Sequence, residues 1–190
     1  MDQVTIPIWR PESGPLLAGR LDGRRTFARA LEGLPSANKA LLVILDFRNI
    51  DFASSSFLSE AVLRFRDHLR LSRTPSYLVA ANLADKPLEE LDYLLTRSAD
   101  ALIVCTLSMN GEISEPKLIG SLDQKLKETF DLVLRKGETN AVELHSESNQ
   151  ADQVGPTAWN NRLNLLSAKS LLIEIPQGRT KKFRPLLEVS

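Results

Sequence analysis

The distribution of apolar residues over the first 119 positions predicts alternating strands and helices. The strongest predicted strand covers 40–47 (Ala-Leu-Leu-Val-Ile-Leu-Asp-Phe), because a continuous apolar run is typical of a strand covered on both faces. Further strands are expected at 5–8, as a short edge strand, at 77–81 and at 101–106. Asn110-Gly111 predicts a type I′ hairpin turn, with positive φ at both positions, which folds 112–119 back on the preceding strand.

Helical periodicity fills the intervals between these strands. Helices are expected at 22–34, at 57–71 with Ser56 of the preceding turn as N-cap, and from Asp85, which would cap a helix with Pro87 in its first turn. Alternating strands and helices of these lengths favour an α/β layer. The residues expected to face inward are Phe27, Ala28, Leu31 and Leu34, then Leu58, Ala61, Val62, Phe65 and Leu69, and finally Leu88, Leu91, Leu94 and Leu95.

The pattern changes near Gly120 to three helices followed by a strand, a turn and a strand. Ser121 and Gln124 have capping-box spacing and predict a helix that Gly137 ends. A short helix is expected at 140–144, and Pro156 begins the third. In this third helix Trp159, Leu163 and Leu166 recur at helical spacing. The opposite face would hold Thr157, Asn160, Asn161 and Asn164, and the amides of the three asparagines are of the kind that pair with adenine edges.

Composition places the chain among globular proteins with balanced charge, 24 basic against 24 acidic residues. No apolar run approaches the ~20 residues of a membrane span, and the first residues lack the features of a signal peptide. We therefore expect a cytoplasmic protein that does not enter a membrane. Cys105, the only cysteine, lies in an apolar run and is expected to be a buried small hydrophobe.

Charge is segregated in the last third of the chain. Residues 138–155 hold four acidic residues and no Lys or Arg, which predicts an acidic back behind a basic front. The turn at Gly178 is flanked by Arg179, Lys181 and Lys182, which would reach phosphate or a minor groove. The basic front would comprise Arg162, Lys169, Arg179, Lys181, Lys182 and Arg184 against Glu174 and Glu188.

Residues 45–58 (Leu-Asp-Phe-Arg-Asn-Ile-Asp-Phe-Ala-Ser-Ser-Ser-Phe-Leu) place a serine-rich turn between an Asp-ended strand and a helix. This segment resembles the STAS-like domains, relatives of the anti-sigma factor antagonists. In the antagonists an ATPase-fold kinase phosphorylates the second serine of an Asp-Ser-Ser-Gly-Leu turn, so the resemblance implies Ser56, with Ser55 beside it, as a regulatory site. Ser54 and Phe57 replace the Asp and Gly of that turn, as in STAS-like proteins encoded with or fused to ATPase modules. Helix capping alone also explains three serines here.

Residues 157–172 resemble the recognition helix and following strand of bacterial winged-helix transcription regulators, in which a Gly usually stands at the position of Ser170. Together the two resemblances imply an α/β STAS-like N-terminal domain (1–119) plus an α+β winged-helix C-terminal domain (120–190). They imply a cytosolic transcription regulator that binds duplex DNA. A homodimer is expected, because such readers usually bind paired half-sites.

No assembled active site can be recognised in the sequence. His68 and His145 are isolated from other potential zinc ligands. Asp46, Asp51 and Glu60 could form a carboxylate cluster, but Asp46 is better explained as a polar cap at a strand end that orients the serine turn. We expect no enzyme, metal or cofactor. The alternative to DNA binding is a partner-switching protein that docks on an ATPase-fold, kinase-like partner through its serine turn.

Overall fold

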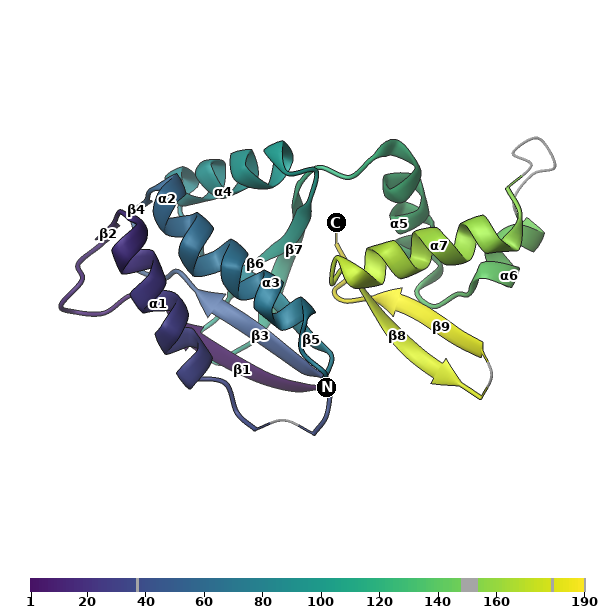
Figure 1. Ribbon diagram of the computed structural model, residues 1–190, viewed down its shortest axis with the longest axis horizontal. Helices are drawn as coiled ribbons and strands as arrows, with labels where there is room; N and C mark the ends of the chain where they lie inside the picture. The colour runs from purple at the N-terminus through teal and green to yellow at the C-terminus, as the bar shows by residue number, and fades with distance from the viewer. Residues whose placement is uncertain (37, 148–153, 179, 190) are drawn as a thin grey trace. The chain divides into compact units, whose positions relative to one another are not determined.

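The structure, a computed structural model, describes residues 1–36, 38–147, 154–178 and 180–189. Its chain divides into two compact units, Met1–Ser121 and Leu122–Val189 (Figure 1). The first unit is a mixed α/β fold with a mainly parallel sheet, which confirms the α/β character expected for the N-terminal part. The second unit combines helices with a two-stranded sheet.

The sheet of the first unit has the order β1-β3-β5-β6-β7, with β1 at one edge. The first four strands are parallel and β7 is antiparallel to β6. A separate pair, β2 (Leu16–Leu17) and β4 (Phe52–Ala53), lies beside the serine turn. The five strands are β1 (Asp2–Pro7), β3 (Leu41–Asp46), β5 (Ser76–Ala81), β6 (Ala101–Leu107) and β7 (Ile113–Gly120).

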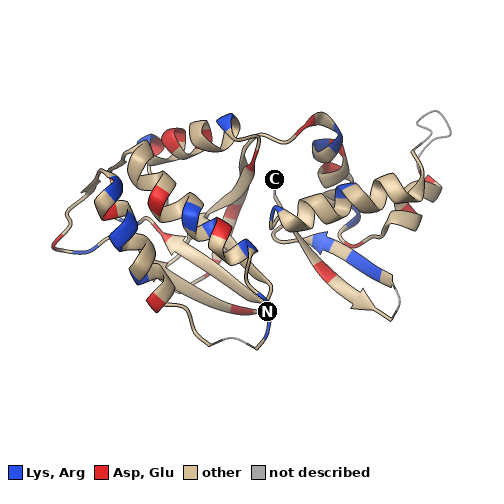
Figure 2. Cartoon of the chain, in the orientation of Figure 1, with Lys and Arg blue, Asp and Glu red and all other residues tan. Residues whose placement is uncertain are grey.

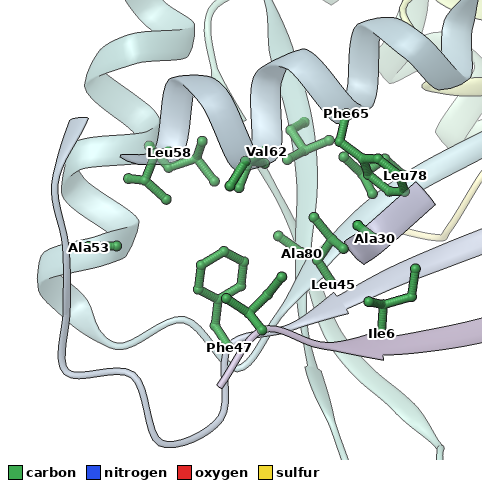
Figure 3. Packing of buried hydrophobic residues seen from close by; sticks show 14 of the residues in the cluster. Ile6, Ala30, Leu45, Phe47, Ala53, Leu58, Val62, Phe65, Leu78 and Ala80 are labelled. Atoms are coloured by element: carbon green, nitrogen blue, oxygen red, sulfur yellow. The ribbon is translucent and has the colours of Figure 1, made fainter. Parts of the chain in front are cut away.

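Helices connect the parallel strands of the first unit. They are α1 (Arg20–Glu32), α4 (Asp85–Arg97) and a continuous helix made of α2 (Ser55–Leu58), the π-helical turn η1 (Ser59–Leu63) and α3 (Arg64–Arg70). Their inner residues share one apolar cluster with alternate residues of the central strands (Figure 3). Leu42 and Ile44, which point the other way from β3, are buried as well, so the prediction of a strand covered on both faces is confirmed.

The buried face of α1 differs from the prediction. Ala28 is exposed, whereas Gly23, Thr26 and Ala30 are buried. Phe27, Leu31 and Leu34 are only partly buried against the apolar cluster. Small residues face inward because α1 packs closely on the helix that follows the serine turn. By contrast, the inward residues expected in that following helix are all buried, from Leu58 to Leu69.

Four local predictions are corrected at the ends of elements. Asn110-Gly111 does form the β6–β7 hairpin, but only Gly111 has positive φ, +81°, so the turn is not type I′. The N-caps are Ala84 instead of Asp85, and Asp123 instead of Ser121. Asp123 accepts the Leu126 amide at 3.0 Å, which a residue two positions earlier cannot do. The cap of the serine turn is Ser54, described below.

The described residues of the second unit form three helices and a β-hairpin. A further extended residue, Thr139, lies between the first two helices and exchanges both backbone hydrogen bonds with Phe183, at 2.9 and 2.7 Å, so the hairpin gains a one-residue third strand. Phe130, Trp159, Leu163 and Phe183 are buried in its core. The elements are α5 (Gln124–Lys136), α6 (Ala141–Glu147), α7 (Pro156–Ala168), β8 (Leu172–Gln177) and β9 (Thr180–Pro185).

Candidate functional site

Helix α7 has one buried face and one polar face. Gly155 is its N-cap and Pro156 occupies its first turn. Trp159, Leu163 and Leu166 are buried, as their spacing predicts. The structure brings the four predicted DNA-reading residues together on the opposite face; none of their side chains has a hydrogen-bond partner among the described residues. Thr157 and Asn161 are exposed, and Asn160 and Asn164 are half-buried.

The beginning of α7 borders a groove of about 750 Å³ within the second unit. Thr157 and Asn160 line one wall, Asn140–Val142 at the start of α6 form another, and the hairpin contributes Glu174 and Lys181. Asn161 and Asn164 are not part of this lining. The predicted readers therefore form two pairs on the same helix face, with Thr157 and Asn160 lining the groove and Asn161 and Asn164 outside its lining.

The two described lysines of the hairpin are held in ion pairs. Lys181 Nζ lies 2.9 Å from Glu174 Oε2, and it also lies over the Phe183 ring. Lys182 Nζ lies 3.2 Å from Glu138 Oε1 and 3.9 Å from Glu143 Oε1. Adjacent side chains of a strand point to opposite faces, so these lysines diverge instead of projecting together. Arg179, the third predicted cation, lies outside the described residues.

These ion pairs correct the expected separation of an acidic back from a basic front. Basic residues on β9 lie beside an acidic residue on β8 (Figure 2). Glu143 is positioned by a capping box at the start of α6. The Asn140 side chain accepts from the Val142 and Glu143 amides at 2.9 Å each, and the Glu143 carboxylate accepts from the Asn140 amide at 3.2 Å. The Asn-x-x-Glu spacing could have indicated this partner of Lys182.

The serine turn joins three elements of the first unit. Ser54 Oγ accepts from the Phe57 amide at 3.3 Å and from the Gly19 amide at 3.2 Å, so Ser54, not Ser56, is the N-cap. Ser55 Oγ donates to the Glu90 carboxylate on α4. Ser56 Oγ lies 3.2 Å from Ser54 Oγ, which is the only hydrogen bond of the Ser56 side chain among the described residues. All three serines are half-buried.

Asp46 closes the carboxyl end of β3, as expected of a polar cap at a strand end. Its Oδ1 accepts from the Arg48 amide at 3.0 Å and from Asn82 Nδ2 at 2.7 Å. Asn82 Oδ1 in turn accepts from the Leu107 amide at 3.0 Å. Asp46 thus ties together the ends of three parallel strands, and it has no hydrogen bond to the serine turn. The expectation that it orients the serines is therefore wrong.

Two further candidates for chemistry have structural explanations. Glu60 forms ion pairs with Arg24 and Arg64, and the hydrogen bond from Arg24 is the main cause of its lowered pKa. Cys105 is buried, as expected; burial and then the charge of Asp46 raise the pKa of its thiol to about 11, which keeps it protonated near neutral pH. Across the described residues no three His, Cys, Asp or Glu side chains gather as a metal site.

Comparisons with family models, curated proteins and solved structures find no match for this chain. In the part of the chain that the structure describes, no helix has the length and apolar character needed to span a membrane.

Proposed function

We propose that the second unit is a winged-helix domain that binds duplex DNA through α7, and that the first unit is a STAS-like domain that regulates it. The observation that carries the proposal is the polar face of α7, where Thr157, Asn160, Asn161 and Asn164 have side chains without hydrogen-bond partners inside the described chain. Asn amides can pair with both N6 and N7 of adenine, and a major groove admits an α-helix.

The order of elements supports the assignment of the second unit. Three helices followed by a two-stranded hairpin is the order expected of a winged helix, and the Thr139–Phe183 bridge ties the segment between the first two helices to that hairpin. Ser170 has φ +63°, a conformation that glycine adopts freely. This is the position at which winged-helix regulators usually carry Gly.

The phosphate contribution to binding is expected to be modest. Lys181 and Lys182 are already paired with carboxylates, so a phosphate must displace Glu174 from one and Glu138 from the other. Each phosphate that a protein cation neutralises contributes about 0.9 to the magnitude of the slope of log K against log salt, through the counterions that it releases. Because the lysines exchange one anion for another, we expect each to contribute less than this. Discrimination between sequences would then come mainly from α7.

Selection of duplexes with the purified protein, followed by fluorescence anisotropy, tests the proposal. Asn161→Ala should weaken binding to the selected duplex by about 1–3 kcal/mol and binding to random duplex far less, because the variant cannot hydrogen-bond to a base. Asn110 is an exposed asparagine in the first unit, so Asn110→Ala is the matched control. It should change the affinity for neither the selected duplex nor the random duplex. Equal losses on both duplexes would assign Asn161 to the DNA backbone, and no saturable binding to any duplex would refute the proposal.

Replacement of Arg179, Lys181 and Lys182 by Ala tests the hairpin separately. If these side chains bind phosphates, the salt dependence should flatten by up to about one unit for each phosphate that the variant no longer binds. If the slope of log K against log salt is unchanged in this variant, the hairpin makes no phosphate contacts. Half-site spacing in the selected duplexes, together with the mass of the complex, tests the predicted homodimer.

The serine turn supports a second candidate, docking of an ATPase-fold, kinase-like protein. Ser56 is half-buried, and among the described residues its hydroxyl hydrogen-bonds only to another serine hydroxyl. Leu16 and Leu21, on either side of Gly19, are 64% and 61% exposed. Ser56→Asp should retain the fold and change partner or DNA binding, because it adds a charge in the first turn of a helix. Ser54→Ala should instead lower stability by about 0.5–2 kcal/mol, because it removes the cap.

Melting curves and binding assays separate the two roles of the turn. Ser56→Ala is the control and should melt like the wild type, because the cap is Ser54. If Ser56→Asp binds both DNA and the candidate partner as the wild type does, the turn is structural and the switching hypothesis fails.

A further inference from the structure

A small cavity lies where the end of the edge strand β1 faces α1. Its volume is about 210 Å³. Ile6, Ile8 and Ala30 supply an apolar part of its lining, and Arg10, Thr26 and Arg29 a polar part. Two arginines belong to the lining, and neither Asp nor Glu does. Helix α1 carries several basic residues along its length (Figure 2).

Arg29 carries a positive charge that no carboxylate of the described residues neutralises within ion-pair distance. Its Nη2 donates to Thr26 Oγ1 at 3.0 Å, in the same helix. The neighbouring arginines differ, since Arg10 pairs with Glu12 at 3.5 Å and Arg25 with Asp22 at 3.2 Å. Burial, followed by the charge of Arg10, lowers the pKa of Arg29. More distant carboxylates raise this pKa but do not outweigh the two effects. Arg29 therefore lines the cavity with N–H donors and a positive charge that are available to a ligand.

The chemistry of the lining selects the kind of ligand. A guanidinium presents paired N–H donors that match a carboxylate or a phosphate. The adjacent cavity of about 330 Å³ shares Thr26 and Arg29 but also includes Glu12 and Asp22, so its charge is mixed. Ligand pockets for drug-sized molecules are larger, about 300–1,000 Å³, which restricts the cavity at β1 to a smaller molecule.

We propose that this cavity binds a small organic anion, with its carboxylate or phosphate on Arg29 and Arg10 and its short apolar part against Ile6 and Ile8. None of its lining residues belongs to α7 or to the serine turn. Such a site would make the first unit a sensor of a small anionic compound.

Titration of the full-length protein with butyrate, butyl phosphate and the neutral analogue butyramide tests this site. Amide chemical shifts of Thr26 and Gly33 report on occupancy. Butyrate or butyl phosphate should give saturable shifts with a millimolar or lower dissociation constant, and butyramide should not. Arg29→Gln should weaken binding at least about tenfold, because it removes a charged hydrogen bond.

Arg25→Gln is the matched control, because it removes a charge from the same helix but not from this cavity; its affinity should stay within about twofold of the wild type. If Arg29→Gln does not fold, Arg10→Gln should still weaken binding at least about threefold. The proposal is overturned if neither anion gives saturable shifts, if butyramide binds equally, or if loss of the arginines leaves the affinity unchanged.

Discussion

At the scale of single residues, Asp100 is an acidic residue that the fold almost completely buries, with 7% of its surface exposed. Arg70 donates to its two oxygens at 2.5 and 3.3 Å, and Arg66 lies 3.1 Å from Oδ2. Burial by itself raises the pKa of Asp100. The hydrogen bonds and charge of Arg70, the charge of Arg66 and the Ala101 amide outweigh it, so the pKa falls from 3.8 to about 2.

Asp100→Asn should lower the free energy of unfolding by about 3–5 kcal/mol at neutral pH, because it leaves two arginines buried without their shared counter-charge. The lowered pKa means that the charge of Asp100 stabilises the folded state fully above about pH 4 and progressively less as pH falls to about 2. Urea unfolding between these pH values should show this loss in the wild type and not in the variant.

Asp67→Asn is the control for Asp100→Asn. Asp67 also contacts Arg66, at 2.8 Å, but its side chain is 58% exposed, so its loss should change stability by at most about 1 kcal/mol. Similar losses in the two variants would show that burial does not distinguish these carboxylates.

At the scale of elements, Gly23 determines how closely α1 approaches the helix that follows the serine turn. A methyl group on Gly23 would lie 2.8 Å from both the Phe57 carbonyl oxygen and Glu60 Cβ. A backbone atom cannot move aside as a flexible side chain can. The packing of two helices around the serine turn therefore depends on the absence of a side chain at this position.

Gly23→Ala should destabilise the protein by about 1–3 kcal/mol through overpacking, although Ala favours a helix over Gly by about 1 kcal/mol. Gly33→Ala is the matched control. Its φ is −77°, and an added methyl would meet its nearest atoms at 3.5–3.7 Å, so stability should be equal to or slightly above that of the wild type. Chemical denaturation measures both, and a stabilised Gly23→Ala variant would contradict the packing argument.

At the scale of the whole molecule, each unit has apolar residues of its own to bury. The first has the cluster around Leu45, Phe57 and Phe65, and the second buries Phe130, Trp159 and Phe183. The chain passes from one unit to the other at Ser121 and Leu122. Separate cores favour units that can fold separately.

We therefore expect fragments 1–121 and 122–190 each to fold, as judged by circular dichroism and cooperative melting. Under the proposed function, fragment 122–190 should bind the selected duplex within about threefold of the full chain, a difference under about 1 kcal/mol. Fragment 1–121 should not bind it. If only folded fragment 1–121 binds the selected duplex, our proposal places DNA recognition in the wrong unit.

The order of the longer elements in both units could be predicted from the sequence because the signals for it are local, whereas the two-residue strands β2 and β4 were not predicted. The apolar run at 40–47 indicated a buried strand, and the inward face from Leu58 to Leu69 followed from a period of 3.6 residues. The same reasoning placed Trp159, Leu163 and Leu166 in the core. It therefore also placed Thr157 and the three asparagines together on the remaining face of α7.

Only the tertiary structure decided the features that depend on which distant segments meet. Ser54, and not Ser56, became the cap because the chain enters the helix after β4, where Gly19 also reaches the Ser54 hydroxyl. Lys182 is paired because the bridge between Thr139 and Phe183 brings Glu138 and Glu143 to it. The sequence by itself thus determined the longer elements and most of their apolar faces, with α1 as the exception, since these follow from the periodicity of neighbouring residues. Caps, ion pairs and the cavity at Arg29 required the fold, since each depends on groups that only packing brings within a few ångströms.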